Sequence, residues 1–240
     1  MIPELGQFAL ILALLVAALQ AILPLLGAQT GRQRWIAVAR PAALIQCALV
    51  GLSFALLTHA FVVQDFSVAY VAQNSNSDLP MLYRYSAVWG AHEGSLLLWA
   101  LILSIWTAVV ALRTRALPDA FVARVLSVLG FVAVGFLLFT ILTSNPFLRH
   151  VPGLADGNDL NPLLQDPGLI IHPPMLYTGY VGFAVAFAFA VAAMLEGRGD
   201  SRWVRWARPW TLVAWAHRLA DDLYFYNDCS WCFFPSSRSI

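Results

Sequence analysis

The chain has 240 residues, of which 60% are hydrophobic and 11% are charged, with a formal net charge of +1. Soluble domains carry roughly 25% charged residues, so this composition excludes an ordinary soluble protein and indicates a multi-span membrane protein. All the basic residues are arginines, and because they form no basic tract or stripe, we expect no nucleic-acid partner.

Apolar runs long enough to cross the roughly 30 Å hydrocarbon core of a bilayer recur along the chain. The first follows Glu4 and lacks a basic segment before it, so we expect no cleavable signal peptide. A sixth apolar segment begins at Pro209 and fails near His217. The predicted fold is an all-α membrane protein, a polytopic bundle of about five to six transmembrane helices with two long outer loops. The five complete spans are predicted at residues 6–27, 41–63, 95–112, 125–144 and 175–195.

The arginines divide the connecting segments into two classes. Segments 28–40, 113–124 and 196–208 hold ten of them, whereas the long loops 64–94 and 145–174 hold two. Because cytoplasmic loops of membrane proteins carry an excess of arginine and lysine, the arginine-rich segments are predicted to face the cytoplasm. The N-terminus and both long loops then lie on the outer side.

The first outer loop leads into the third span through Tyr-Arg-Tyr-Ser-Ala-Val-Trp-Gly-Ala-His-Glu-Gly-Ser-Leu-Leu-Leu-Trp, residues 83–99. Its aromatic residues, Trp89 among them, suit either the aromatic belt of a membrane interface or an apolar platform for a planar ligand. Glu93 lies near a helix start, where the macrodipole favours a carboxylate. His92 and Glu93 are also candidates for a proton relay or for ligand binding, because ionisable groups at membrane depth are usually functional.

The second outer loop ends in Asp-Pro-Gly-Leu-Ile-Ile-His-Pro-Pro-Met-Leu-Tyr, residues 166–177. The two prolines suit the first turn of a helix, and proline disfavours the α region for the residue before it. We therefore expect His172 just before the helix, near the membrane boundary. It is either a helix-start histidine bonded to the loop backbone or a ligand of haem iron or another metal.

Residues 75–99 and 160–180, together with the opening Met-Ile-Pro-Glu-Leu-Gly, resemble the CcmF family, the large membrane subunit of bacterial cytochrome c haem lyase. The resemblance runs from residue 1 to about Trp215. It implies a haem lyase subunit that handles haem and assists its covalent attachment to apocytochrome c. His172 matches the family's His-Pro-Pro-Met-Leu-Tyr histidine, an axial ligand of haem b. Trp89, His92 and Glu93 are weaker cofactor-binding candidates, and no catalytic residue is assigned.

The same resemblance implies partners and a location. A haem chaperone, a thiol-handling subunit and apocytochrome c are the expected partners, besides membrane lipid. The expected location is the bacterial inner membrane, with the N-terminus and long loops on the periplasmic side. The alternative function is that of a polytopic transporter or proton-coupled membrane subunit without haem, in which His92 and Glu93 form part of a proton path.

Residues 216–240 depart from the family, which continues with an apolar span and then with the second haem b ligand. Each charge exposed to lipid in mid-span costs a few kcal/mol, so we expect this segment not to insert stably. We divide the chain into residues 1–215, part of a haem-handling membrane domain, and an anomalous tail, 216–240, interpreted as a frameshift or truncation that leaves the fragment inactive alone. The Cys-x-x-Cys pair of the tail is interpreted as incidental. The tail carries His217, Arg218, Asp221, Asp222, Cys229 and Cys232.

Overall fold

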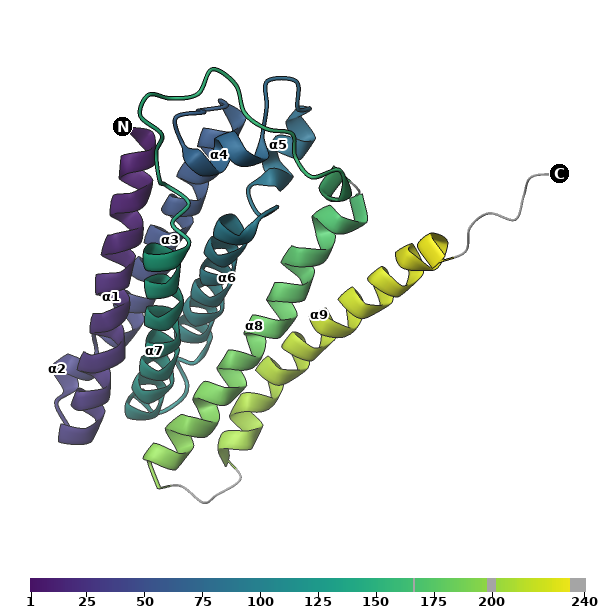
Figure 1. Cartoon of the computed structure of the whole chain (residues 1–240). Coiled ribbons are helices and arrows are strands. Elements are labelled where there is room, and N and C mark those ends of the chain that lie inside the picture. Colours follow the sequence, from purple (N-terminus) through teal and green to yellow (C-terminus); the bar gives the residue numbers. More distant parts are fainter. Residues whose placement is uncertain (166, 198–201, 234–240) are drawn as a thin grey trace.

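The computed structural model describes residues 1–165, 167–197 and 202–233 as a bundle of long helices (Figure 1). Short helices occupy the connections between the long ones. The pair Cys229 and Cys232 lies on the last helix, but its side chains fall outside the described residues. The helices are α1 Ile2–Thr30, α2 Gln33–Ile36, α3 Ala39–Val62, α4 Ala69–Asn74, α5 Met81–Ala87, α6 His92–Arg113, α7 Asp119–Thr143, η1 Pro162–Gln165, α8 Pro167–Leu195 and α9 Arg202–Phe233.

Five of the described helices are long and apolar enough to cross a membrane, and they confirm the predicted membrane fold. They correspond to the five predicted spans, although the third begins at His92 and the fifth at Ile170, each a few residues early. Helix α9 is not among them. It is nevertheless a continuous helix through Phe233, so the described part of the segment after Trp215 is helical. The expectation that this segment does not insert stably stays a prediction.

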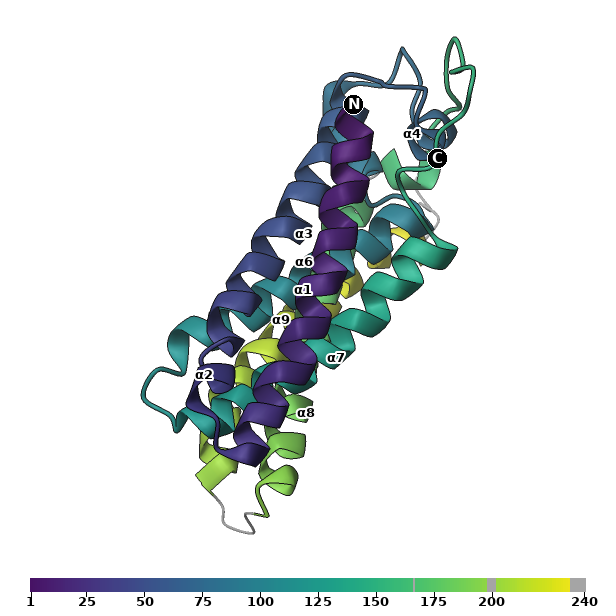
Figure 2. The ribbon, with the colours of Figure 1, turned by 90° about the vertical axis from the view of Figure 1, so that its left-hand side faces the viewer.

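Helix α1 packs on α3 and α7, α6 contacts α3, α7 and α8, and α8 runs beside α9 (Figures 1 and 2). Because lipid tails are as apolar as leucine, helices in a membrane associate through close packing at small residues. On α8, a Cβ added to Gly179 would lie 2.7 Å from the backbone nitrogen of Arg218. A Cβ added to Gly182 would lie 2.8 Å from the Cβ of Ala214. Glycine at both positions therefore sets the spacing between α8 and α9.

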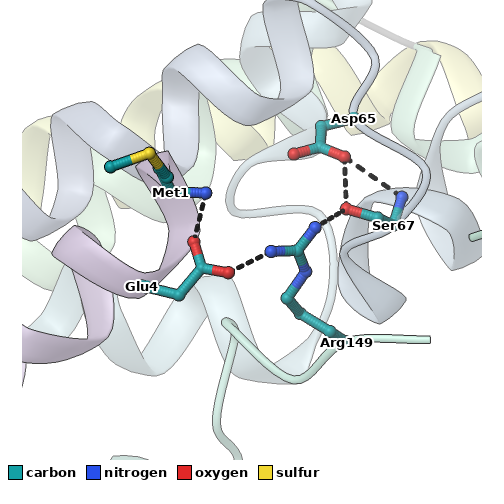
Figure 3. A network of polar contacts seen from close by, with 5 residues as sticks. All are labelled: Met1, Glu4, Asp65, Ser67 and Arg149. Carbon is teal, nitrogen blue, oxygen red and sulfur yellow. Dashed lines mark hydrogen bonds and ion pairs between the residues drawn. The ribbon is translucent and has the colours of Figure 1, made fainter. Parts of the chain in front are cut away.

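The two long loops lie at the same end of the bundle as the N-terminus, and the arginine-rich turns lie at the other (Figure 1). A polar network joins the loops to α1 (Figure 3). The guanidinium of Arg149 donates to the Glu4 carboxylate and, at 2.6 Å, to the hydroxyl of Ser67. The Asp65 carboxylate accepts from the same hydroxyl, and the amino terminus pairs with Glu4 at 2.6 Å. The loop 145–161 is thereby fixed to the start of both α1 and α4.

A second set of contacts closes the loops on each other. The Asp156 carboxylate accepts hydrogen bonds from the backbone nitrogen of Ser77 at 3.0 Å and from its hydroxyl at 2.8 Å. The Ser77 hydroxyl and the Gly157 N–H hold the pKa of Asp156 below its usual value. A Cβ on Gly157 would lie 2.0 Å from the carbonyl oxygen of Ser75, so this close approach requires glycine. We call this joined pair of loops, residues 64–91 and 145–161, the outer cap.

The packing of α9 on α8 predicts the effect of substituting Gly179. In Gly179→Ala the new methyl group meets the backbone of Arg218, and such overpacking costs typically about 1–3 kcal/mol. We expect a lower thermal midpoint in detergent, measured by circular dichroism. Gly135→Ala is the control, because nothing lies within 4 Å of a Cβ there and alanine favours a helix. Equal midpoints for the two variants would contradict the packing of residues 214–218 on α8.

Candidate functional site

His172 lies inside α8, and the expectation that it precedes the helix is wrong. The helix begins at Pro167, five residues earlier, and Pro173 and Pro174 both lie within it. The helix start therefore lies before the two prolines that were expected to form its first turn. Inside a helix, proline removes a hydrogen bond to the carbonyl four residues earlier. Pro174 therefore leaves the carbonyl of Ile170 without its helical donor.

The Trp89 indole supplies the missing donor. Its Nε1 donates to the carbonyl oxygen of Ile170 at 3.2 Å. The hydroxyl of Ser95 in turn donates to the backbone oxygen of Trp89 at 2.8 Å. The structure thus places this predicted site residue against α8, two residues from His172, in a role that anchors the outer cap to the helix.

Tyr70, which the sequence analysis did not single out, holds the segment that carries Trp89. Its hydroxyl lies 3.1 Å from the carbonyl oxygen of Val88, to which it donates, and accepts from the backbone nitrogen of Ala91 at 3.2 Å. The side chain is buried, and burial raises the pKa of Tyr70 well above its ordinary value. A buried tyrosine hydroxyl requires such partners, so the tyrosine fixes the backbone of residues 88–91.

The His172 ring is held by a carboxylate from α9. Nδ1 lies 2.8 Å from Oδ1 of Asp221, and the aspartate side chain is 1% exposed. An ionised carboxylate only accepts hydrogen bonds, so with Asp221 ionised Nδ1 is the donor in this pair. The other oxygen, Oδ2, is buried without a hydrogen-bond partner among the described residues. Sequence reasoning missed Asp221 because it lies in the tail, although a carboxylate in an apolar segment is itself a signal for a polar partner.

The other two candidates lie at the start of α6. The His92 side chain is exposed, and its ring packs edge-on against Phe139 of α7, with the ring centroids 6.2 Å apart. Glu93 lies in the first turn of α6, where the helix dipole favours its charge. The structure therefore brings Trp89 to the helix of His172 and turns His92 toward α7. Among the described residues, no three His, Cys, Asp or Glu side chains gather as a metal site.

Trp99, further along α6, packs against aromatic residues of α7 and α8. The Trp99 ring lies 5.4 Å from that of Phe136 and 5.1 Å from that of Tyr177, with interplanar angles of 40° and 62°. Inclined rings of this kind interlock helices α6, α7 and α8. The ring of Trp99 is therefore in contact with aromatic rings of both α7 and α8.

Histidines that bind a metal usually donate their second ring N–H to a carboxylate or carbonyl, and the contact of His172 with Asp221 is compatible with that arrangement. The family model described as cytochrome C assembly protein matches residues 89–219. That match covers more than half of the chain, and the chain belongs to this family. Trp89, His92, Glu93 and His172 all lie inside the matched segment.

Several relatives share the sequence at high identity. The chain is 64% identical over 217 residues to the cytochrome c-type biogenesis protein CcmF of Pseudomonas aeruginosa, covering 90% of this chain and 33% of the relative. It is 56% identical to CcmF of Escherichia coli, with the same coverage. The protein CycK of Rhizobium meliloti is 55% identical over 235 residues, 96% of this chain and 35% of the relative. This chain therefore spans about a third of the length of these curated relatives.

A solved structure, the cytochrome c heme lyase CcmF, has the same fold. The TM-score is 0.79 at 32% identity, over 90% of this chain and 34% of that one. The resemblance to CcmF stated from the loop motifs is thus confirmed by sequence and by structure.

The hydrogen bond to Asp221 predicts the tautomer of His172. In Asp221→Asn the strong acceptor is lost, so we expect the proton to distribute over both ring nitrogens, measured by ¹⁵N spectra of histidine-labelled protein. The control is Asp222→Asn, because Asp222 is half-exposed and pairs instead with Arg218 at 3.1 Å. A His172 spectrum unchanged in Asp221→Asn would show that the carboxylate does not hold the ring.

Proposed function

We propose that this chain forms part of a haem-handling subunit of the cytochrome c maturation system. The single observation that carries the proposal is the position of His172, which lies within the family segment 89–219 and is held by a buried carboxylate. The names of the relatives, cytochrome c-type biogenesis proteins and a cytochrome c heme lyase, support the same role. Because the chain covers a third of those relatives, the activity of the whole protein is inferred from them.

In this proposal His172 is an axial ligand of a haem b. A metal-bound histidine usually donates its second ring N–H to a carboxylate or carbonyl, which fixes the ring and makes it a better ligand. With the proton on Nδ1, the lone pair that coordinates iron resides on Nε2. A bound haem would supply a redox-active iron, and His172 would hold it. Trp89 and Tyr70 contribute indirectly, because they hold the outer cap against the helix turn before His172.

The outer cap is the surface that we propose for the partners. Haem chaperone, thiol-handling subunit and apocytochrome c would meet the protein on the periplasmic side of the inner membrane, where the cap lies if the arginine-rich turns are cytoplasmic. The domain boundary at residue 215 stays a prediction, and the contact between His172 and Asp221 crosses it. For this reason we include the described part of α9 in the proposed haem-handling unit.

The proposed haem role predicts the effect of His172→Ala. We place this change in a chain completed with the remaining part of a CcmF relative, and expect loss of most of the bound haem because the iron loses an axial ligand. The pyridine haemochrome assay measures it. Met175→Leu is the control, since it conserves volume on the same helix. Undiminished haem in His172→Ala would return the histidine to a structural role.

The proposed orientation predicts which loops react with a membrane-impermeant thiol reagent. In a variant whose own cysteines are serines, a cysteine at Ala155 in the outer cap should react in intact cells. A cysteine at Gln33, in the arginine-rich turn after α1, should react only after permeabilisation. Both side chains are exposed, so access to either is limited by the membrane alone. Labelling of Gln33→Cys but not Ala155→Cys in intact cells would reverse the orientation.

A further inference from the structure

A groove runs between α6 and α9, from the arginine-rich end of the bundle to Thr178 of α8. Its first part is a pocket of about 620 Å³ at the arginine-rich end of the bundle. Its second part, of about 290 Å³, lies further along the same two helices. Trp106, Val109 and Val213 line both parts, so the two pockets adjoin.

The groove is cationic at one end and apolar along its length. Arg113, the last residue of α6, and Arg205, in the first turn of α9, line the first part. Both arginines are exposed, and neither forms an ion pair in the part of the chain that the structure describes. The second part is lined by apolar side chains such as Ile102 and Ile105, with only Thr178 and His217 as polar neighbours.

The dimensions of the groove match one leaflet of a bilayer. Arg113 lies eleven residue steps after Ile102 along α6, which is about 17 Å at 1.5 Å per residue. The hydrocarbon core is about 30 Å thick, so the groove extends about half-way across it. Trp206 and Trp210 line the groove beside Arg205, and tryptophan is the residue enriched at the membrane–water boundary.

We propose that this groove binds an anionic phospholipid from the leaflet at the arginine-rich end. The phosphate would lie between Arg113 and Arg205, because guanidinium groups bind phosphate oxygens through paired hydrogen bonds. One acyl chain would lie along the apolar part of the groove. Basic pockets between transmembrane helices bind anionic lipid headgroups in this way. The occupant is a lipid rather than a soluble anion because the groove continues as an apolar channel beyond the arginines.

Native mass spectrometry of the delipidated 240-residue chain tests the proposal. The probes are dioleoyl phosphatidylglycerol and dioleoyl phosphatidylcholine, which share their acyl chains and differ in charge. Each basic residue near a membrane surface contributes about fivefold in lipid affinity, so we expect phosphatidylglycerol to bind at least tenfold more tightly. Arg113→Gln combined with Arg205→Gln should abolish that preference. Arg32→Gln combined with Arg34→Gln, at the same end but outside the groove, should leave it unchanged.

A second variant tests the apolar part. Val109→Trp fills the apolar part of the groove and leaves Arg113 and Arg205 unchanged, so it should weaken binding of both lipids several-fold. Equal binding of the two lipids to the unchanged chain would overturn the proposal. So would an equal loss of the preference for phosphatidylglycerol in the two double arginine variants. Retention of inorganic phosphate at the same concentration would assign the arginines to a soluble anion. A dimer that forms in place of the lipid adduct would assign the groove to a second copy of the chain. Either result would also overturn the lipid site.

Discussion

Polar groups inside this bundle must find their partners within the protein, because hydrocarbon offers no hydrogen bonds. Hydroxyl groups such as that of Thr107 use a carbonyl of their own helix, whereas several larger polar groups use a partner from another segment and so join two parts of the bundle. The amide of Gln20 on α1 donates to the carbonyl oxygen of Leu126 on α7 at 2.8 Å. The Trp89 indole and the Asp221 carboxylate satisfy polar groups of α8 in the same way. Around α8 these hydrogen bonds add to the close packing of Gly179 and Gly182 against α9.

The two prolines after His172 show how the requirement produces a site. Pro174 frees a carbonyl oxygen, and that oxygen accepts the hydrogen bond through which Trp89 fixes the outer cap to α8. Tyr70, buried in the same cap, fixes the backbone on either side of Trp89. The carbonyl of Ile170, left unpaired by Pro174, therefore binds Trp89 and holds the outer cap beside His172.

The apolar spans could be predicted from the sequence because their length and composition alone determine that they cross a bilayer. The placement of His172 could not be predicted in this way, because a pair of prolines is compatible with two positions. It can lie at the start of a helix, or it can lie inside a helix if another group donates to the carbonyl that the proline leaves unpaired. The deciding donor, Trp89, lies 81 residues away. Asp221 was set aside for a similar reason: a charge in an apolar segment is costly alone, and only the fold shows the His172 ring beside it. The roles of His92 and Glu93 stay predictions.

The pairing of Glu4 with Arg149 joins residues 145 positions apart in the chain. A ribosome adds about 5–20 residues per second, so roughly 7 to 30 s pass between synthesis of the glutamate and synthesis of its arginine. For most of that interval the neighbours available to the first helix are those on α2 and α3, since α7 ends only a few residues before Arg149. The ion pair between Glu4 and Arg149 can thus form only after the four long helices α1, α3, α6 and α7 have been synthesised.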